Sequence, residues 1–223
     1  MNVASADADA NARATWPIRK AERADIPQLV RMFSAAFRDD PFVEWIVRAD
    51  ARRDARRELL FAITLNALSS ELSDTYTVET LAGCAVWRRS RDCKLPLLRQ
   101  LALVPGFCRV GGLLRINALL RAFAHLDELH ERYAPEPHQY LHVVGVSPEH
   151  QGHGLGRSLL EPALGRFDQQ GEPAYLETFK PRNVPFYEKL GFRSVGRVDF
   201  APLPPGWLML RDPARCSSPR PLR

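Results

Sequence analysis

The stretch that most constrains the fold runs from Tyr140 to Gly156 and reads YLHVVGVSPEHQGHGLG. It begins with alternating bulky and β-branched residues, which are typical of a buried strand. The strand should end at Ser147-Pro148, because proline cannot donate to a sheet ladder. Three glycines, Gly152, Gly154 and Gly156, come next, and apolar residues then recur at helical spacing. The stretch therefore predicts a strand, a glycine-rich turn and a helix.

A turn of this kind favours an anion such as a phosphate, since it directs free backbone N–H groups and the positive end of a helix dipole at one point. Neither of two common phosphate motifs fits. Gly156 is followed by Arg157 and Ser158 without the lysine of a P-loop, and the glycine spacing does not match a dinucleotide fingerprint. The glycines by themselves also allow a tight turn that binds no ligand.

Composition indicates one globular domain with a substantial core. The chain has 223 residues, of which 45% are hydrophobic and 26% charged, and a formal net charge of +5. We expect no membrane span and no secretory signal, because no apolar run or N-terminal pattern fits either. The positive charge suits a polyanionic ligand but is equally compatible with an ordinary solvated surface.

The cysteines argue against a zinc site and against a disulfide framework, because they are widely spaced and form no Cys-x-x-Cys pair. A reduced, cytoplasmic setting without a metal is therefore expected. The four are Cys84, Cys93, Cys108 and Cys216.

Helices and strands should alternate along residues 16–211, between a disordered tail at 1–15 and a frayed tail at 212–223. Strands are expected at 16–20, 76–79, 83–88, 140–146, 174–179, 192–200 and 207–210. Helices are expected after Asp25, which is a candidate N-cap, at 42–47, at 52–68 with an arginine-rich outer face, at 154–169 and after Asn183, a second candidate N-cap. The interleaving predicts a single domain of α/β or α+β type with a mixed sheet.

Residues 94–133 read as a long helical insertion that breaks at Pro105-Gly106 and near Gly111-Gly112. Its second part carries an apolar stripe with arginines beside it, which favours a helix packed on the domain over one lying on a membrane. His125 and His130 are five residues apart, so they do not share a helix face and are not expected to bind a metal. The stripe comprises Leu113, Ile116, Leu120, Phe123 and Leu126.

From Tyr140 to Val198 the chain resembles the GNAT superfamily of N-acetyltransferases, and within it the branch that contains puromycin N-acetyltransferase. The likeness rests on Gln151-x-x-Gly154-x-Gly156 after Val144-Gly145-Val146-Ser147-Pro148. It also rests on the short motifs LET at 176–178, PRN at 181–183 and PFYEKLGF at 185–192. It implies a central mixed sheet of six or seven strands flanked by helices, with acetyl-CoA at the splay between two parallel strands. Asp40 and the insertion depart from the puromycin enzyme, which argues against puromycin as the acceptor.

The resemblance implies an acetyl-CoA-dependent N-acetyltransferase in which an amine attacks the thioester directly. Tyr187 is the expected acid for the thiolate, although its periodicity alone fits a core aromatic residue. Glu177 is the leading base, with His142 and water as alternatives. The N–H of Val146 is the implied oxyanion donor. The implied cofactor-binding residues are Val144, Val146, Gln151, Gly152, His153, Gly154, Leu155, Gly156, Arg157, Ser158, Asn183 and Tyr187.

His142 is a candidate because Tyr140, His142, Val144 and Val146 should share one strand face. The acceptor is expected to be a small cationic amine, a metabolite or an antibiotic-like molecule, since Asp39, Asp40 and Glu44 should join Glu177 on the acceptor side. Two alternatives stay open, a non-catalytic acyl-CoA-binding or sensing module and a protein N-acetyltransferase. We expect no nucleic-acid or membrane partner, and a monomer or a homodimer.

Overall fold

The computed structural model describes residues 16–67, 72, 74–93 and 96–214. The tail predicted at 1–15, most of the one predicted at 212–223, and Cys216 lie outside these residues. The strands are β1 Ile18–Lys20, β2 Thr75–Val78, β3 Gly83–Arg89, β4 Gln139–Val146, β5 Ala174–Thr178, β6 Arg193–Val198 and β7 Gly206–Arg211. The helices are α1 Ile26–Ala36, α2 Pro41–Ile46, α3 Arg53–Ala67, α4 Leu97–Gly111, α5 Ile116–Tyr133, α6 Leu155–Gln170 and α7 Val184–Glu188.

Within the described residues the strands form one seven-stranded sheet in the order β1-β2-β3-β4-β5-β7-β6. Neighbouring strands are antiparallel except β4 and β5, which are parallel. These two pair at Gln139 with Ala174 and at Tyr140 with Tyr175, and beyond Tyr140 and Tyr175 the two strands do not pair with each other. The predicted mixed sheet with a splay between two parallel strands is therefore confirmed.

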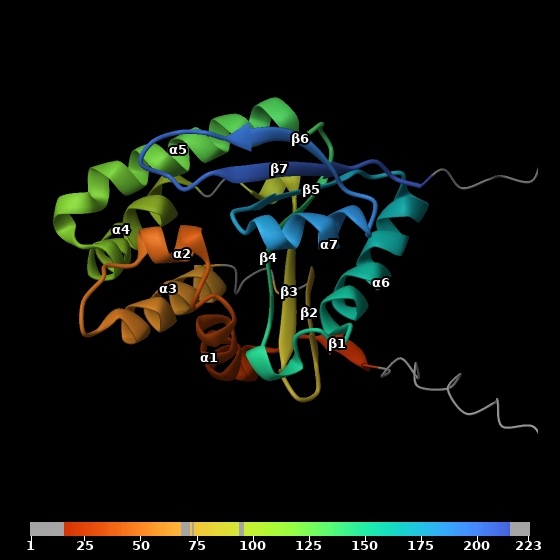
Figure 1. Cartoon of the computed structure of the whole chain (residues 1–223), viewed down its shortest axis with the longest axis horizontal. Helices are drawn as coiled ribbons and strands as arrows, with labels where there is room; N and C mark the ends of the chain where they lie inside the picture. The colour runs from red at the N-terminus through yellow and green to blue at the C-terminus, as the bar shows by residue number, and fades with distance from the viewer. Residues whose placement is uncertain (1–15, 68–71, 73, 94–95, 215–223) are drawn as a thin grey trace, which may run out of the picture.

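Helices cover both faces of the sheet (Figure 1). One apolar cluster joins α1, α2, α3 and the α4–α5 pair to the face that carries Val86 and Val143. A second joins α6 and α7 to the opposite face, where Ala174 and Leu176 of β5 lie. Tyr175, between those two residues, packs instead with α5, β6 and β7. The alternation along β5 thus assigns each side chain to one layer of helices.

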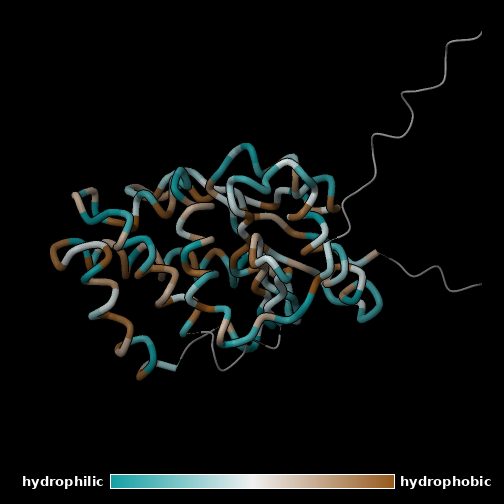
Figure 2. The backbone as a smooth tube through the Cα atoms, turned by 90° about the horizontal axis from the view of Figure 1, so that it is seen from below, coloured by the Kyte–Doolittle hydropathy of each residue, from teal (hydrophilic) through white to brown (hydrophobic). Residues whose placement is uncertain are grey.

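Amphipathic helices account for these layers, and Figure 2 shows brown hydrophobic and teal hydrophilic stretches alternating along the helical coils. Helix α6 has almost its predicted bounds, and Pro162 lies inside it. It begins after Gly154 and ends at Gly171, both in the left-handed backbone region that glycine adopts without steric cost.

The predicted insertion forms α4 and α5, but two details of the prediction were wrong. Helix α4 continues through Pro105 at an exposed position, so the first predicted break is absent, whereas the second is found at Gly112, whose φ is +90°. The apolar stripe was also only partly right, since Phe123 and Leu126 pack against the core but Leu113 belongs to a separate 3-10 turn before α5. Leu120 is half exposed, and the buried residues of α5 are Leu119, Ala122 and Leu129.

Two predicted caps also differ in the structure. Asp25 precedes α1 without capping it, since its carboxylate accepts the Glu22 N–H at 2.8 Å and binds Arg19. Asn183 precedes α7, again without a side-chain capping bond, because it closes the 3-10 turn Pro181–Asn183. In both cases a 3-10 turn leads directly into the helix and holds the residue in helical backbone geometry, whereas an N-cap side chain needs an extended one.

In the described part of the chain, no single helix is long and apolar enough to cross a membrane, although α4 and α5, bent by 115° at their junction, pass a test of length and composition as a pair. Among the same residues, no three His, Cys, Asp or Glu side chains are grouped so as to hold a metal ion.

Candidate functional site

The splay between β4 and β5 exposes backbone groups of β4. The Ser147 N–H donates to the Ala82 carbonyl, on the β3 side, at 2.7 Å. Because successive backbone groups of a strand point to opposite sides, the N–H groups of Val144 and Val146 point away from β3 and into the splay. The Gln151 side chain donates to the Val146 carbonyl at 3.0 Å, which agrees with this direction.

A β-bulge in β4 changes which side chains share a face. Val86 of β3 pairs with Val143 and Trp87 pairs with Leu141, so His142 is the extra residue. As a consequence Tyr140 packs with the α5 side of the sheet, whereas Val144 and Val146 pack with α6 and α7. The prediction that Tyr140, His142, Val144 and Val146 share one face was therefore wrong, since a bulge interrupts strict alternation.

The glycine-rich turn leads from β4 into α6. Gly152 and Gly154 have φ values of +81° and +82°, which disfavour any residue with a side chain, and open space surrounds the position of an added Cβ at each. A Cβ added at Gly156 would lie 3.5 Å from the Phe186 ring of α7. The turn therefore brings backbone N–H groups to the start of a 16-residue helix, with room in front of them.

The other residues predicted in this turn have distinct surroundings. Leu155 is buried and anchors α6 in the core, while the Ser158 N–H closes the first helical bond to Gly154 at 3.0 Å. His153 is exposed, and its carbonyl accepts a long bond from Trp16 Nε1 at 3.5 Å. Arg157, partly exposed, pairs with Glu161 at 3.1 Å. The predicted anion site is thus made chiefly of backbone, with Arg157 the cationic side chain at its edge.

Tyr187 lies in α7 on the same side of the sheet as the turn. Its ring is buried against Phe186 and Phe192, with centroids 5.1 and 5.9 Å away. Burial raises the pKa of its hydroxyl, and the nearby charge of Asp40 adds to the effect. A phenol of raised pKa stays protonated at neutral pH and can donate a proton, but to a strong base only.

Glu177 extends from β5 on the opposite face, and its side chain is 11% exposed. Its Oε2 accepts the Tyr140 hydroxyl at 2.7 Å, and its Oε1 lies 3.6 Å from Nδ1 of His130 on α5. Burial raises the pKa of Glu177 to about 7, although Tyr140 and the nearby Tyr175 hydroxyl oppose the rise. The Tyr175 hydroxyl is close but makes no geometrically good bond within the described residues. A carboxyl with this pKa is half ionised at neutral pH, as a general base should be.

His142, the alternative base, is at the bulge. Burial lowers its pKa to about 4, so the ring is neutral at pH 7. Its Nδ1 is buried and has no hydrogen-bond partner among the described residues. His130 was not singled out as a site residue, because its proximity to Glu177 depends on how α5 packs across β4 and β5 and leaves no local signal in the sequence.

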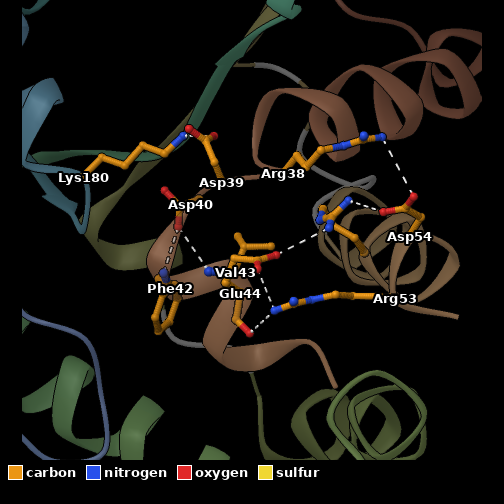
Figure 3. A network of polar contacts seen from close by, with 10 residues as sticks. Arg38, Asp39, Asp40, Phe42, Val43, Glu44, Arg53, Asp54 and Lys180 are labelled. Carbon is orange, nitrogen blue, oxygen red and sulfur yellow. Dashed lines mark hydrogen bonds and ion pairs between the residues drawn. The ribbon is translucent and has the colours of Figure 1, made fainter. Parts of the chain in front are cut away.

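The carboxylates expected to attract a cationic acceptor are already engaged (Figure 3). Asp39 pairs with Lys180 at 2.5 Å and with Arg182 at 2.8 Å. Glu44 pairs with Arg53 at 2.7 Å and with the buried Arg57 at 3.4 Å. Asp39 and Glu44 are therefore paired with cationic side chains of the chain itself. Arg57 is buried and is not on the arginine-rich outer face predicted for this helix.

Asp40 has a structural task. It is buried at the N-terminus of α2, where its Oδ1 accepts the Phe42 and Val43 N–H groups at 3.0 and 3.1 Å (Figure 3). Burial raises its pKa in spite of these two bonds. Its Oδ1 therefore caps the start of a helix.

Comparisons with known proteins agree with this geometry. The sequence profile of the "Acetyltransferase (GNAT) family" matches residues 74–192. An uncharacterized N-acetyltransferase of Schizosaccharomyces pombe is 49% identical over 53 residues, which cover 24% of this chain and 22% of that protein. The mycothiol acetyltransferase of Paenarthrobacter aurescens is 39% identical over 88 residues, which cover 37% of this chain and 27% of that protein. The match thus spans about a quarter of each curated relative.

A crystal structure of a Corynebacterium glutamicum protein, described as histone acetyltransferase HPA2 and related acetyltransferase, has the same fold. It superposes with a TM-score of 0.63 at 23% identity and covers 90% of this chain and 98% of its own. These relatives do not bear on the puromycin branch. Since the profile covers more than half of the sequence and the sheet has the expected splay, the chain belongs to the GNAT family of acetyltransferases.

Proposed function

We propose that the protein transfers the acetyl group of acetyl-CoA to the primary amine of a small molecule. The observation that carries this proposal is the position of Glu177, a buried carboxylate beside the splay with a pKa of about 7. A carboxylate of that kind accepts the proton of an attacking amine, and a module that merely binds acyl-CoA has no need of one.

Acetyl-CoA is assigned to the turn and the splay. The pyrophosphate would bind the N–H groups of residues 151–157, where each charge-assisted hydrogen bond contributes about 1.5–3 kcal/mol. The pantetheine arm would lie along β4, where Val144 and Val146 direct backbone groups into the splay. We assign the Asn183 side chain, which makes no capping bond to α7, to the same arm.

The chemistry needs a base, an oxyanion donor and an acid. Glu177 first takes a proton from the ammonium form of the acceptor, and the neutral amine then attacks the thioester carbonyl while the Val146 N–H donates to the oxyanion. Tyr187 gives its hydroxyl proton to the departing thiolate and regains one from the nitrogen of the new amide, so that it relays a proton and is not left as a tyrosinate. Glu177 then releases its proton to solvent, so the net reaction turns the ammonium and acetyl-CoA into an amide, the CoA thiol and one proton.

The size of the acceptor is inferred from what covers Glu177. Helix α5 packs over this carboxylate, and aromatic side chains of α2 and of the segment after β5 continue the cover, since Phe42 stacks on Phe179 with a centroid distance of 4.4 Å. A small amine fits beneath such a cover more readily than a folded protein. The relatives named mycothiol acetyltransferase favour the same class.

A screen of amines with acetyl-CoA tests the proposal, with thiol release and product mass as readouts. The panel combines small primary amines with peptides that have free N-termini or lysines. We expect turnover with at least one small amine and little with peptides. Tight acetyl-CoA binding without thiol release across the panel would instead identify a binding or sensing module, and turnover confined to peptides would identify a protein acetyltransferase.

A further inference from the structure

A pair of histidines next to Glu177 has no place in the reaction described so far. His130 of α5 and His138, just before β4, approach with their Nε2 atoms 2.8 Å apart and their ring centroids 4.9 Å apart. The His138 side chain is 1% exposed and the His130 side chain 16%. Two buried imidazoles at this distance must share a proton between the two nitrogens.

The position of that proton follows from the other nitrogen of His138. Its Nδ1 is 2.8 Å from the Pro135 carbonyl. A carbonyl oxygen can only accept, so His138 Nδ1 must carry a proton. Burial lowers the pKa of His138 and lowers that of His130 to about 4, so both rings are neutral at pH 7. A neutral His138 that is protonated at Nδ1 has a bare Nε2, and the shared proton therefore belongs to Nε2 of His130.

The assignment determines what His130 presents to the base. With its proton on Nε2, a neutral His130 has a bare Nδ1, and this atom lies 3.6 Å from Glu177 Oε1. We propose that His138 holds His130 in this tautomer, so that the bare Nδ1 receives a hydrogen bond from Glu177 once Oε1 has taken the proton of the acceptor amine. His130 and His138 are then positioning residues for the base, an inference that rests on the proposed role of Glu177.

The two oxygens of Glu177 would therefore have different tasks. Oε2 accepts the Tyr140 hydroxyl at 2.7 Å and anchors the carboxylate. When Glu177 is ionised, Oε1 faces the lone pair of His130 Nδ1. When Oε1 is protonated, it donates a hydrogen bond to that nitrogen. Such an arrangement favours the protonated form, and it selects Oε1 as the atom that takes the proton.

Other titratable groups also face this cluster and contribute to its pH dependence. Asp127 of α5 raises the pKa of Glu177, and the Cys93 thiol interacts with the same carboxylate. Glu136 and Glu131 raise the pKa of His130, against the larger lowering by burial. From β3 and β4, Arg88 and His142 border the cluster, as Tyr175 does from β5.

Histidine nitrogen NMR of the uniformly ¹⁵N-labelled protein tests the tautomers without acetyl-CoA or an acceptor. At pH 7 we expect His130 as the neutral form protonated at Nε2 and His138 as the neutral form protonated at Nδ1. A proton on Nδ1 of His130 would overturn the proposal. Because this measurement does not require activity, it separates failure of the tautomer assignment from failure of the proposed acetyl transfer.

A second experiment follows the carboxyl ¹³C signal of Glu177 with pH in the wild type and in His138→Phe. Phenylalanine lacks the Nε2 of His138 that accepts a hydrogen bond from His130. His130 can then place its proton on Nδ1 and donate to ionised Glu177. The titration midpoint of Glu177 should then fall by about one pH unit. The control is His125→Gln, which changes a histidine of the same helix that pairs with Glu128. An unchanged or raised midpoint in folded His138→Phe would contradict the proposal.

Discussion

The glycine-rich turn and the cluster around Glu177 lie on opposite faces of the same two strands, yet they are built differently. The turn is made of backbone N–H groups from residues 151–157, consecutive in sequence, at the start of α6. The cluster joins side chains from α5, β4 and β5 that are up to 47 residues apart in sequence, from His130 to Glu177. The first site depends on local conformation, and the second on the packing of a helix across a sheet.

The most severe test of the local site is Gly154→Glu. The side chain would occupy the open space in front of the turn, place a carboxylate against the pyrophosphate and strain a residue with φ of +82°. We expect the affinity for acetyl-CoA, measured by calorimetry, to fall by about 10³-fold or more, as loss of two or three charge-assisted bonds predicts. The control is Gly165→Glu, at an exposed position of the same helix with open space around it. Normal affinity in folded Gly154→Glu would place the cofactor elsewhere.

Tyr187→Phe tests the proposed acid, which acts between the bound cofactor and the acceptor. The change keeps the ring packing and removes only the hydroxyl. If that hydroxyl protonates the thiolate, kcat should fall by roughly 10²–10⁴-fold while acetyl-CoA affinity hardly changes. Single-turnover kinetics with an acceptor from the amine screen give both quantities. An unchanged chemical step would leave Tyr187 with its packing role alone.

Asp40→Ala should have the smallest effect and concerns stability. Loss of the two bonds to the first turn of α2 should lower the free energy of unfolding by about 1 kcal/mol. Asp40→Asn should be nearly neutral, since asparagine caps a helix as well as aspartate does. Chemical denaturation of both variants provides the measurement. A large loss of acceptor binding in Asp40→Asn, with unchanged stability, would restore this carboxylate to the acceptor site.

The contrast between the two sites explains what could be predicted from the sequence. Strand β4, the glycine-rich turn and α6 follow from residues that are adjacent in the chain. The sequence motifs around Glu177 and Tyr187 indicated the family and the splay. The ion pairs of Asp39 and Glu44 could not be foreseen, because Lys180 and Arg57 approach them only after α2 packs against its neighbours. The bulge at His142 also left no signal, since the alternation of β4 continues on both sides of it.

The phase of α5 shows the same limit. Its hydropathy allowed a stripe through Leu113 and Leu120, but the turn before the helix and the packing against the sheet select Leu119 and Ala122 instead. That phase carries His130 to Glu177. The residues that surround Glu177 on the acceptor side could therefore not be predicted, because they depend on tertiary packing that the hydrophobic periodicity of α5 does not determine.

The pH dependence of kcat/KM in the wild type and in Glu177→Gln tests the central claim most directly. The pKa of Glu177 is raised to about 7, and the ionised form is the base, so wild-type activity should rise as the pH passes up through about 7. The glutamine variant should lose that rise, and its deficit should shrink at high pH, where more of the amine arrives already neutral. The same midpoint in both proteins, with a deficit that does not vary with pH, would contradict the assignment of Glu177 as the base.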